Sequence, residues 1–237
     1  MNEKLDPAAR KILKTPSYTV SEVAGFLFLP TSTLRSWVMG RVYPTKVGAR
    51  RFRALIHAPQ TNPTVLSFIN VVEAHVLSAI RRTHHIPVQK VRRALDYVEH
   101  RFRVEHPLAD REFLTDGVEL FVEGRGGELE VASRGGQLGI RDLLAAHLRR
   151  IDRDPRGVPI RLYPFTRYRE IEEPRPVTID PRIAFGRPVL SGTGIPTEMI
   201  AERFNAGESI DELATDYGRR REEIEEAIRF ERHVEAA

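Results

Sequence analysis

The sequence predicts an α+β fold that is mainly α, organised as three units and a linker. Apolar residues recur at helical spacing through most of the first hundred and the last sixty positions, while strand-like alternation is short. Charge divides the chain similarly: residues 1–103 hold 17 Lys and Arg against six Asp and Glu, residues 104–175 hold 12 against 14, and residues 176–237 hold eight against 13. We therefore expect units at 1–103, 104–168 and 177–237, with a charged, proline-bearing linker at 169–176.

Composition excludes several classes of protein. The chain has no cysteine, which rules out a disulfide framework, thiolate zinc sites and a thiol nucleophile. It has no apolar run of the roughly 20 residues needed to span a bilayer and no apolar leader, so we expect a cytoplasmic protein without a membrane partner. The eight histidines are scattered, and no Ser/His/Asp order stands out. We expect no metal, no cofactor and no enzymatic activity.

Two short helices are predicted near the N-terminus. Thr19 is placed to cap the first, which carries Val20, Val23, Ala24 and Leu27 at helical spacing. The run Phe28-Leu-Pro30 interrupts the pattern, and a second helix follows over 31–38, with Leu34 and Trp37 on the face that packs against Ala24. Its outward face carries short polar side chains and one arginine, which suits a helix that enters the major groove of DNA.

A basic hairpin is predicted next. Residues 41–53 indicate two short strands joined through Gly48, with positive side chains that can contact a phosphate backbone. We expect double-stranded DNA as the partner of this region; the alternative is a winged helix used only for protein contacts. The predicted DNA-binding residues are Thr31, Ser32, Thr33, Arg35, Ser36, Arg41, Lys46, Arg50, Arg51 and Arg53.

A helical hairpin is predicted behind this wing. One apolar stripe runs from Ile69 to Ile80 and another from Val88 to Phe102, with Pro87 placed where the second helix begins. Together, the Tyr18-Thr-Val-Ser-Glu-Val-Ala24 segment, Thr33-Leu-Arg35, Trp37, the wing and the helix pair resemble the MerR-like winged helix family over residues 17–102. Phe28 stands where that family usually has glycine. The resemblance implies DNA binding.

The middle unit is predicted to be a small α+β structure. Residues 117–123 and 128–133 alternate as two strands, an amphipathic helix is marked by apolar positions from Ile140 to Ile151, and residues 158–163 are expected to form a third strand. Two Arg-Gly-Gly runs, at 125–127 and 134–136, are interpreted as turns, with an RNA-binding box as the alternative. The sequence does not say whether this unit binds a partner or a small ligand.

The last unit is predicted to hold a short strand at 177–180 and a second helix-turn-helix. Pro196 begins a helix, Ser209 and Glu212 form a capping box for the next, and Gly218 ends it. The final helix carries many carboxylates, which would repel a polyanion. The acidic residues expected on this helix are Glu222, Glu223, Glu225, Glu226 and Glu231. We expect this unit to bind protein, with a merely solvated charged face as the alternative.

This segment resembles the domain of unknown function numbered 433. The resemblance rests on Ile179-Asp-Pro181, Gly186-Arg-Pro-Val189, Gly192-Thr193, Ile195-Pro196 and the run Ala206-Gly-Glu-Ser-Ile210, although Gly-Thr-Gly replaces the usual Gly-Thr-Arg. Combined with a MerR-like head, it resembles a VapB-type antitoxin along essentially the whole chain. That resemblance implies a homodimeric autorepressor that binds operator DNA and neutralises a PIN-like ribonuclease toxin. The alternative is a MerR-like one-component regulator that senses a small molecule.

Overall fold

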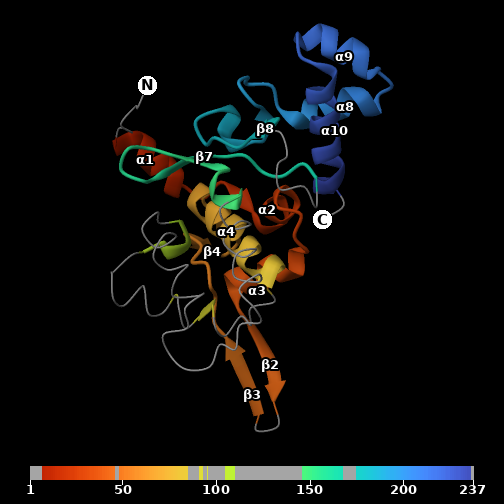
Figure 1. Ribbon diagram of the computed structural model, residues 1–237. Coiled ribbons are helices and arrows are strands. Elements are labelled where there is room, and N and C mark those ends of the chain that lie inside the picture. The colour runs from red at the N-terminus through yellow and green to blue at the C-terminus, as the bar shows by residue number, and fades with distance from the viewer. Residues whose placement is uncertain are drawn as a thin grey trace, which may run out of the picture.

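The computed structural model describes residues 7–45, 48–84, 91–92, 95, 105–109, 146–167 and 175–235. Within them the fold is α+β, with helices more extensive than the small sheets, as the sequence predicts. The wing hairpin lies at one end of the molecule, and the C-terminal helices lie at the other (Figure 1). Among the described residues, no helix combines the length and the apolar character that crossing a membrane requires.

The N-terminal part is built around a buried helix. Helix α1 (Pro7–Lys14) leads into a three-stranded antiparallel sheet in the order β1 (Tyr18–Thr19), β5 (Thr64–Leu66) and β4 (Gln60–Thr61). Between β1 and β4 come α2 (Val20–Phe26), α3 (Thr31–Met39) and the hairpin of β2 (Arg41–Thr45) and β3 (Gly48–Phe52). Helix α4 (Phe68–His84) follows, and its residues 68–80 are all buried.

The predicted helical hairpin is described only in part. Helix α4 ends at His84, inside the predicted break at 83–87. Val91 and Leu95 of the second stripe are both buried in the main core, in agreement with their predicted inward position. The remaining positions of that stripe lie outside the described residues.

The middle unit differs from the prediction at one point. A short 3-10 helix, η1 (Pro107–Ala109), precedes an antiparallel pair of β6 (Ile151–Arg153) and β7 (Pro159–Leu162). Strand β7 confirms the strand expected at 158–163. Ile151 was expected to continue the amphipathic helix, but it begins β6, because its backbone pairs with Leu162. The predicted hairpin at 117–133 and the Arg-Gly-Gly turns lie outside the described residues.

The C-terminal part follows the predicted order of elements. Strands β8 (Val177–Thr178) and β9 (Val189–Leu190) pair antiparallel around the 3-10 helix η3 (Ala184–Gly186). Helices α8 (Thr197–Asn205), α9 (Ile210–Tyr217) and α10 (Arg221–Glu235) then form a small bundle. Pro196 is the N-cap residue of α8, and Ser209 with Glu212 forms the predicted capping box of α9.

Two apolar cores hold these parts together. The main core extends from Leu13 through the buried face of α4 and includes three residues of the C-terminal segment, Val177, Ile179 and Phe230. Backbone hydrogen bonds join Leu162 of β7 to Ile179, with N···O distances of 3.0 and 2.8 Å. A smaller core lies between α8, α9 and α10 and is centred on Ile200 and Ile224. The C-terminal segment is therefore packed directly on the N-terminal part, while the predicted boundaries at 103, 168 and 176 stay a prediction.

Candidate nucleic-acid interface

Helices α2 and α3 form the predicted helix-turn-helix. The hydroxyl of Thr19 accepts a hydrogen bond from the backbone N–H of Glu22 (3.2 Å), and the Glu22 carboxylate accepts one from the backbone N–H of Thr19 (2.7 Å). This reciprocal cap satisfies backbone donors that the first turn of α2 leaves free. Ala24, Leu34 and Trp37 are almost completely buried, so the two helices pack through the predicted faces.

The turn between the helices is a Schellman-type turn made with phenylalanine. Phe28 has a left-handed φ of 52°, and the backbone N–H of Leu29 donates to the carbonyl of Ala24 at 2.8 Å. Glycine normally occupies such a position because a Cβ disfavours this conformation. Here the Phe28 ring packs edge-on against His233 and Phe230 of α10, with centroid distances of 4.6 and 6.2 Å. The departure from glycine thus keeps the turn and adds a contact with the C-terminal helix.

The outward face of α3 carries the polar residues that the sequence predicts. Ser32 and Arg35 are exposed, and Thr31, Thr33 and Ser36 are partly exposed. The Ser36 hydroxyl donates to the carbonyl of Thr33 at 2.7 Å, which occupies its donor within the helix. Arg35 is therefore the long charged side chain that this face presents to a groove.

The wing begins directly after α3. Gly40 adopts a φ of 71°, and a Cβ placed there would lie 2.2 Å from the carbonyl oxygen of Phe52, so only glycine fits this close approach. Strands β2 and β3 then pair in register from Arg41 opposite Phe52 to Thr45 opposite Gly48, which confirms the predicted hairpin. Arg41 and Arg53, at the base of the wing, are exposed.

Three predicted wing residues are described incompletely. Lys46 lies outside the described residues. Arg50 and Arg51 have described backbones within β3, opposite Tyr43 and Val42, and their side chains lie outside the description. The structure therefore places Arg35 on α3 and Arg41 and Arg53 at the base of the wing, while the DNA-binding roles of all six residues remain predictions.

Contacts to the base of the wing fix its position. The guanidinium of Arg92 donates to the carbonyl oxygens of Arg53 and Ala54, the latter at 3.3 Å, and lies over the Phe52 ring at 4.6 Å from its centroid. The backbone N–H of Leu55 also donates to the Trp37 carbonyl at 2.6 Å, which ties the strand to α3. Arg92 is a positioning residue that was not predicted from the sequence, and the available signal was its place next to Val91 of the apolar stripe.

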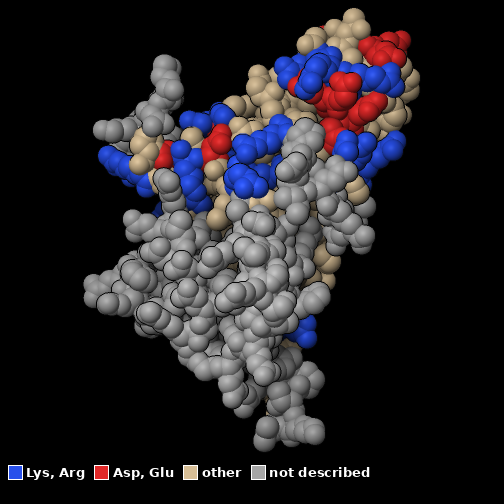
Figure 2. All heavy atoms as spheres, viewed as in Figure 1, with Lys and Arg blue, Asp and Glu red and all other residues tan. Residues whose placement is uncertain are grey.

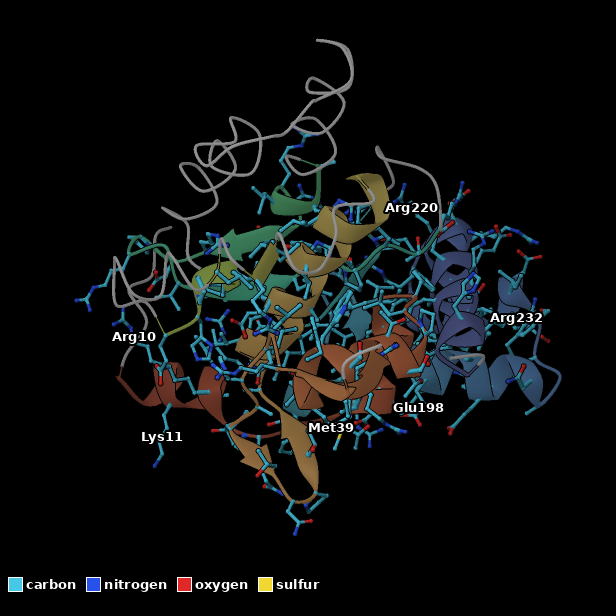
Figure 3. The ribbon with its side chains drawn as sticks, turned by 90° about the horizontal axis from the view of Figure 1, so that it is seen from below. Arg10, Lys11, Met39, Glu198, Arg220 and Arg232 are labelled. Atoms are coloured by element: carbon cyan, nitrogen blue, oxygen red, sulfur yellow. The ribbon has the colours of Figure 1, made fainter. Side chains whose placement is uncertain are left out.

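Two apolar side chains at this end were also missed. Met39, the last residue of α3, is 51% exposed and lies close to the wing strands (Figure 3), and Val42 of β2 is 66% exposed. Apolar groups next to a groove-entering helix can contact thymine methyl groups. Their signal in the sequence was an apolar residue on either side of Gly40-Arg41.

The charges at this end are unpaired within the described part of the chain. Arg35, Arg41 and Arg53 form no ion pair with any described residue. Exposed guanidinium groups without an ion pair among the described residues, on the second helix of a helix-turn-helix and on its wing, are an arrangement that suits phosphate binding. The described residues hold no group of three or more His, Asp or Glu side chains that could bind a metal ion.

Helices α9 and α10 repeat the same backbone motif. Gly218 has a φ of 59°, and the N–H of Arg219 donates to the carbonyl of Ala214 at 2.9 Å, as Leu29 does to Ala24. Gly218 follows Ala214 by four residues, just as Phe28 follows Ala24. Ile224 and Ala227 are completely buried, which confirms the predicted second helix-turn-helix.

Most arginines of the C-terminal helices form ion pairs with carboxylates of the same helices; among the described residues the exception is Arg232, which lies over the Phe204 ring. Arg219 pairs with Glu223 at 2.7 Å, and Arg221 pairs with Asp211 of α9 and with Glu225 at 3.0 Å. Arg203 of α8 likewise contacts Glu208 and, at 2.6 Å, Asp216. Blue and red side chains therefore alternate over α8–α10 in Figure 2.

Two of the five carboxylates expected on the surface of α10 are internal, so that prediction was wrong for them. Glu226 is buried and accepts hydrogen bonds from Thr166 and from Arg167, whose Nη2 lies 2.6 Å from the carboxylate. Glu231 is nearly buried and accepts a hydrogen bond from Thr197 of α8. Both carboxylates hold α10 in place, because their partners belong to other elements of the fold.

Helix α10 also contacts the first helix-turn-helix. A Cβ at Gly25 of α2 would lie 3.0 Å from the Val234 side chain, so the two helices pack as closely as glycine allows. Phe26 stacks on Phe230 with a centroid distance of 6.2 Å. The C-terminal helices are thus fixed against the helix that supports α3 (Figure 1).

Two family models match these parts of the chain. Residues 16–95 match the family described as "Putative DNA-binding HTH domain", and residues 177–230 match "Protein of unknown function (DUF433)". The first spans α2, α3, the wing and α4, and the second spans β8 to α10. Both agree with the helix-turn-helix and the family 433 resemblance recognised in the sequence.

Three proteins of Mycobacterium tuberculosis are similar over most of the chain. "Putative antitoxin VapB45" is 29% identical over 231 residues, covering 90% of this chain and 92% of that protein. "Uncharacterized protein Rv2308" is 27% identical, covering 96% and 94%. The crystal structure of Rv2018 matches with a TM-score of 0.63 at 24% identity, covering 90% of this chain and 98% of that chain, which supports the fold.

Proposed function

We propose that this VapB-like chain, which joins a helix-turn-helix domain to a DUF433 domain, is the DNA-binding antitoxin of a type II toxin–antitoxin system. It binds operator DNA through α3 and the wing and represses its own operon. Its middle and C-terminal parts bind and neutralise a PIN-like ribonuclease toxin. The similarity to an antitoxin over both domains supports the toxin partner. The chain acts as a regulator and catalyses no reaction of its own.

The exposed guanidinium groups of Arg35, Arg41 and Arg53, which have no ion-pair partner among the described residues, carry the DNA part of this proposal. In the MerR-like docking that we propose, α3 lies in the major groove and Arg35 reaches a base edge or a phosphate. Arg41 and Arg53, on the wing, contact the neighbouring phosphates. Contacts of this kind dominate affinity and also make it depend on salt.

A homodimer completes the proposed complex. One helix-turn-helix buries too little surface to select an operator among many competing sites, so two copies binding two half-sites are required. The half-sites are then expected one or two helical turns of DNA apart. Sedimentation of the purified chain with DNA from upstream of its gene measures this stoichiometry, and one chain per operator would contradict the proposal.

Operator binding by substituted chains tests the DNA-binding part. We expect Arg35→Ala and Arg50→Ala to weaken operator binding by about tenfold each. A good base contact contributes about 1–3 kcal/mol to binding, and a phosphate contact contributes less. Arg220→Ala is the matched control, because Arg220 is exposed on the second helix-turn-helix and pairs with Glu223 at 3.6 Å. Equal losses for all three variants would contradict the proposed interface.

Co-expression tests the antitoxin part. We expect the product of the neighbouring gene to arrest growth when produced alone, and this chain to restore growth when both are produced. Arrest that is equal with and without the chain would reject neutralisation. A neighbouring product without nuclease activity would instead favour the one-component regulator.

A further inference from the structure

The outward face of α3 ends in an apolar side chain. Met39 is 51% exposed, whereas Trp37 and Val38 just before it are buried. Met39 follows Arg35 by four residues, and side chains at this spacing lie one turn apart on the same face of an α-helix. Ser32 and Arg35 are both exposed on this face. The face that the proposed function places in the major groove therefore continues from a hydroxyl and a guanidinium group to a thioether.

The segment that carries Met39 has charge of one sign. Residues 23–72, which include α3 and the wing, contain six Lys and Arg and no Asp or Glu. The carboxylates at the two ends of this segment are engaged within the fold, because Glu22 caps α2 and Glu73 is buried and accepts a hydrogen bond from Asn70. A polyanion is the partner that such a segment favours.

A second methionine of similar exposure lies in different surroundings. Met199 of α8 is 49% exposed. Exposed charges of both signs surround it: Glu198, the residue before it, pairs with Arg187, and Glu202 lies three residues further along the same helix face. Single exposed apolar residues are common on protein surfaces, so exposure by itself does not identify a site. The local charge, and not the exposure, distinguishes Met39.

The end of α3 that carries Met39 is fixed. The backbone N–H groups of Leu55 and Ile56 both donate to the Trp37 carbonyl, at 2.6 and 3.1 Å. Gly40, directly after Met39, lies so close to β3 that a Cβ would clash with its backbone. The methionine side chain itself is unbranched, adaptable and polarizable. A fixed backbone thus presents an adaptable apolar group beside the wing (Figure 3).

We infer that Met39 is a specificity-determining residue, which contacts the C5 methyl group of a thymine in the operator, one helical turn from the contact of Arg35. This inference rests on the proposed function and adds a base that the chain recognises. Among the groups that base pairs present in the major groove, the thymine methyl is the apolar one. A second copy of the chain fits less well as the occupant, because a two-fold axis there brings two basic segments together.

Removing the methyl groups from the DNA tests this inference. The probes are two duplexes of the DNA upstream of the gene, one with thymine and one with uracil throughout, since uracil pairs with adenine and lacks only the C5 methyl. We expect the unsubstituted full chain to bind the uracil duplex about fourfold more weakly for each half-site, the factor that corresponds to burying one methyl-sized group.

Substitutions at Met39 assign this preference to its side chain. We expect Met39→Ala to bind the two duplexes within twofold of each other, and Met39→Leu to keep most of the preference because its side chain is apolar and of similar volume. The slope of log K against log salt concentration should not change in either variant, because the contact is uncharged. Met199→Ala is the matched control, and we expect it to keep the full preference.

The outcomes separate the inference from the proposed function. If the unsubstituted chain binds both duplexes equally, the inference is wrong and operator binding stands. If it binds neither, both fall. If Met39→Ala keeps the preference for thymine, the methyl groups act elsewhere or through the shape of the DNA, and the inference is wrong. If Met39→Ala dissociates a dimer and keeps that preference, a second copy covers Met39 and the inference is overturned.

Discussion

The two helix-turn-helix units of this chain share a backbone and differ in what their arginines contact. In α2–α3 the exposed Arg35 and the neighbouring wing residues Arg41 and Arg53 have no ion-pair partner among the described residues, whereas in α9–α10 every arginine except Arg232 pairs with a carboxylate. Both units make the same turn, with φ of 52° at Phe28 and 59° at Gly218. Under the proposed function this local fold serves for DNA contacts in one unit and for protein contacts in the other, and the pairing of its charges decides between them.

The largest expected effect comes from the buried carboxylate that fixes α10. We expect Glu226→Ala to lower the free energy of unfolding by about 3 kcal/mol, because it leaves the guanidinium groups of Arg167 and Arg229 without their carboxylate partner. Glu222→Ala, an exposed change on the same helix, should stay within about 0.5 kcal/mol. Urea unfolding measures both. Equal effects would mean that the acidic residues of α10 are all surface groups, as the sequence had predicted.

Because Glu226 is ionisable, we also predict that the stability of the fold depends on pH. Burial raises the pKa of Glu226, but hydrogen bonds from Arg167, Thr166 and Arg229 outweigh it and hold the pKa below its ordinary value. Its contribution to stability is therefore complete above the unfolded-state pKa of about 4.3 and is lost as pH falls through the folded-state value. We expect the free energy of unfolding of Glu226→Gln to change less with pH, between about pH 5 and 3, than that of the unsubstituted chain. If plots of unfolding free energy against pH were parallel for the two proteins, they would contradict the lowered pKa of Glu226 in the folded state.

Two glycines with a positive φ, Gly40 after α3 and Gly218 between α9 and α10, provide an intermediate effect. We expect Gly40→Ala to cost about 2 kcal/mol, because both its φ and the Phe52 carbonyl oppose a Cβ. Gly218→Ala should cost about 1 kcal/mol, since no atom lies within 4 Å of the added Cβ and only the φ is unfavourable. Thermal unfolding measures the difference. A larger loss at Gly218 would show that the wing tolerates displacement.

The smallest expected effect concerns the turn of the first unit. Phe28→Gly relieves the left-handed strain but removes the ring from His233 and Phe230, so we expect a net loss of about 1 kcal/mol. A double-mutant cycle with His233→Ala measures the part due to that contact. A gain in stability would mean that the ring does not offset the strain of its backbone.

Features with a local cause could be predicted from the sequence. The caps at Thr19 and Ser209 and the stop at Gly218 depend on residues within a few positions of each other, and all three are confirmed. The burial of Ala24, Leu34 and Trp37 followed from helical spacing in the same way. For the candidate site, the outward position of Arg35 and the hairpin could be predicted from the sequence. The contact of Arg92 with the base of the wing could be found only in the structure.

Features with distant causes could not be predicted. Glu226 looked like a surface residue because its partners, Thr166 and Arg167, lie about 60 positions earlier in the chain. Helical spacing alone placed Ile151 in a helix, and only its pairing with Leu162 makes it a strand residue. Phenylalanine disfavours a positive φ; at Phe28 the sequence signal was the glycine usual in the resembled family, whereas no such signal marked Phe185.

The salt dependence of operator binding tests the difference between the two units most directly. Each phosphate contact contributes about 0.9 to the slope of log K against log salt concentration. For Arg41→Ala combined with Arg53→Ala, we predict a slope that is smaller by about 2 than that of the unsubstituted chain. For Arg187→Ala combined with Arg220→Ala, we predict an unchanged slope. Equal reductions in the two double variants would contradict the assignment of DNA binding to the N-terminal unit.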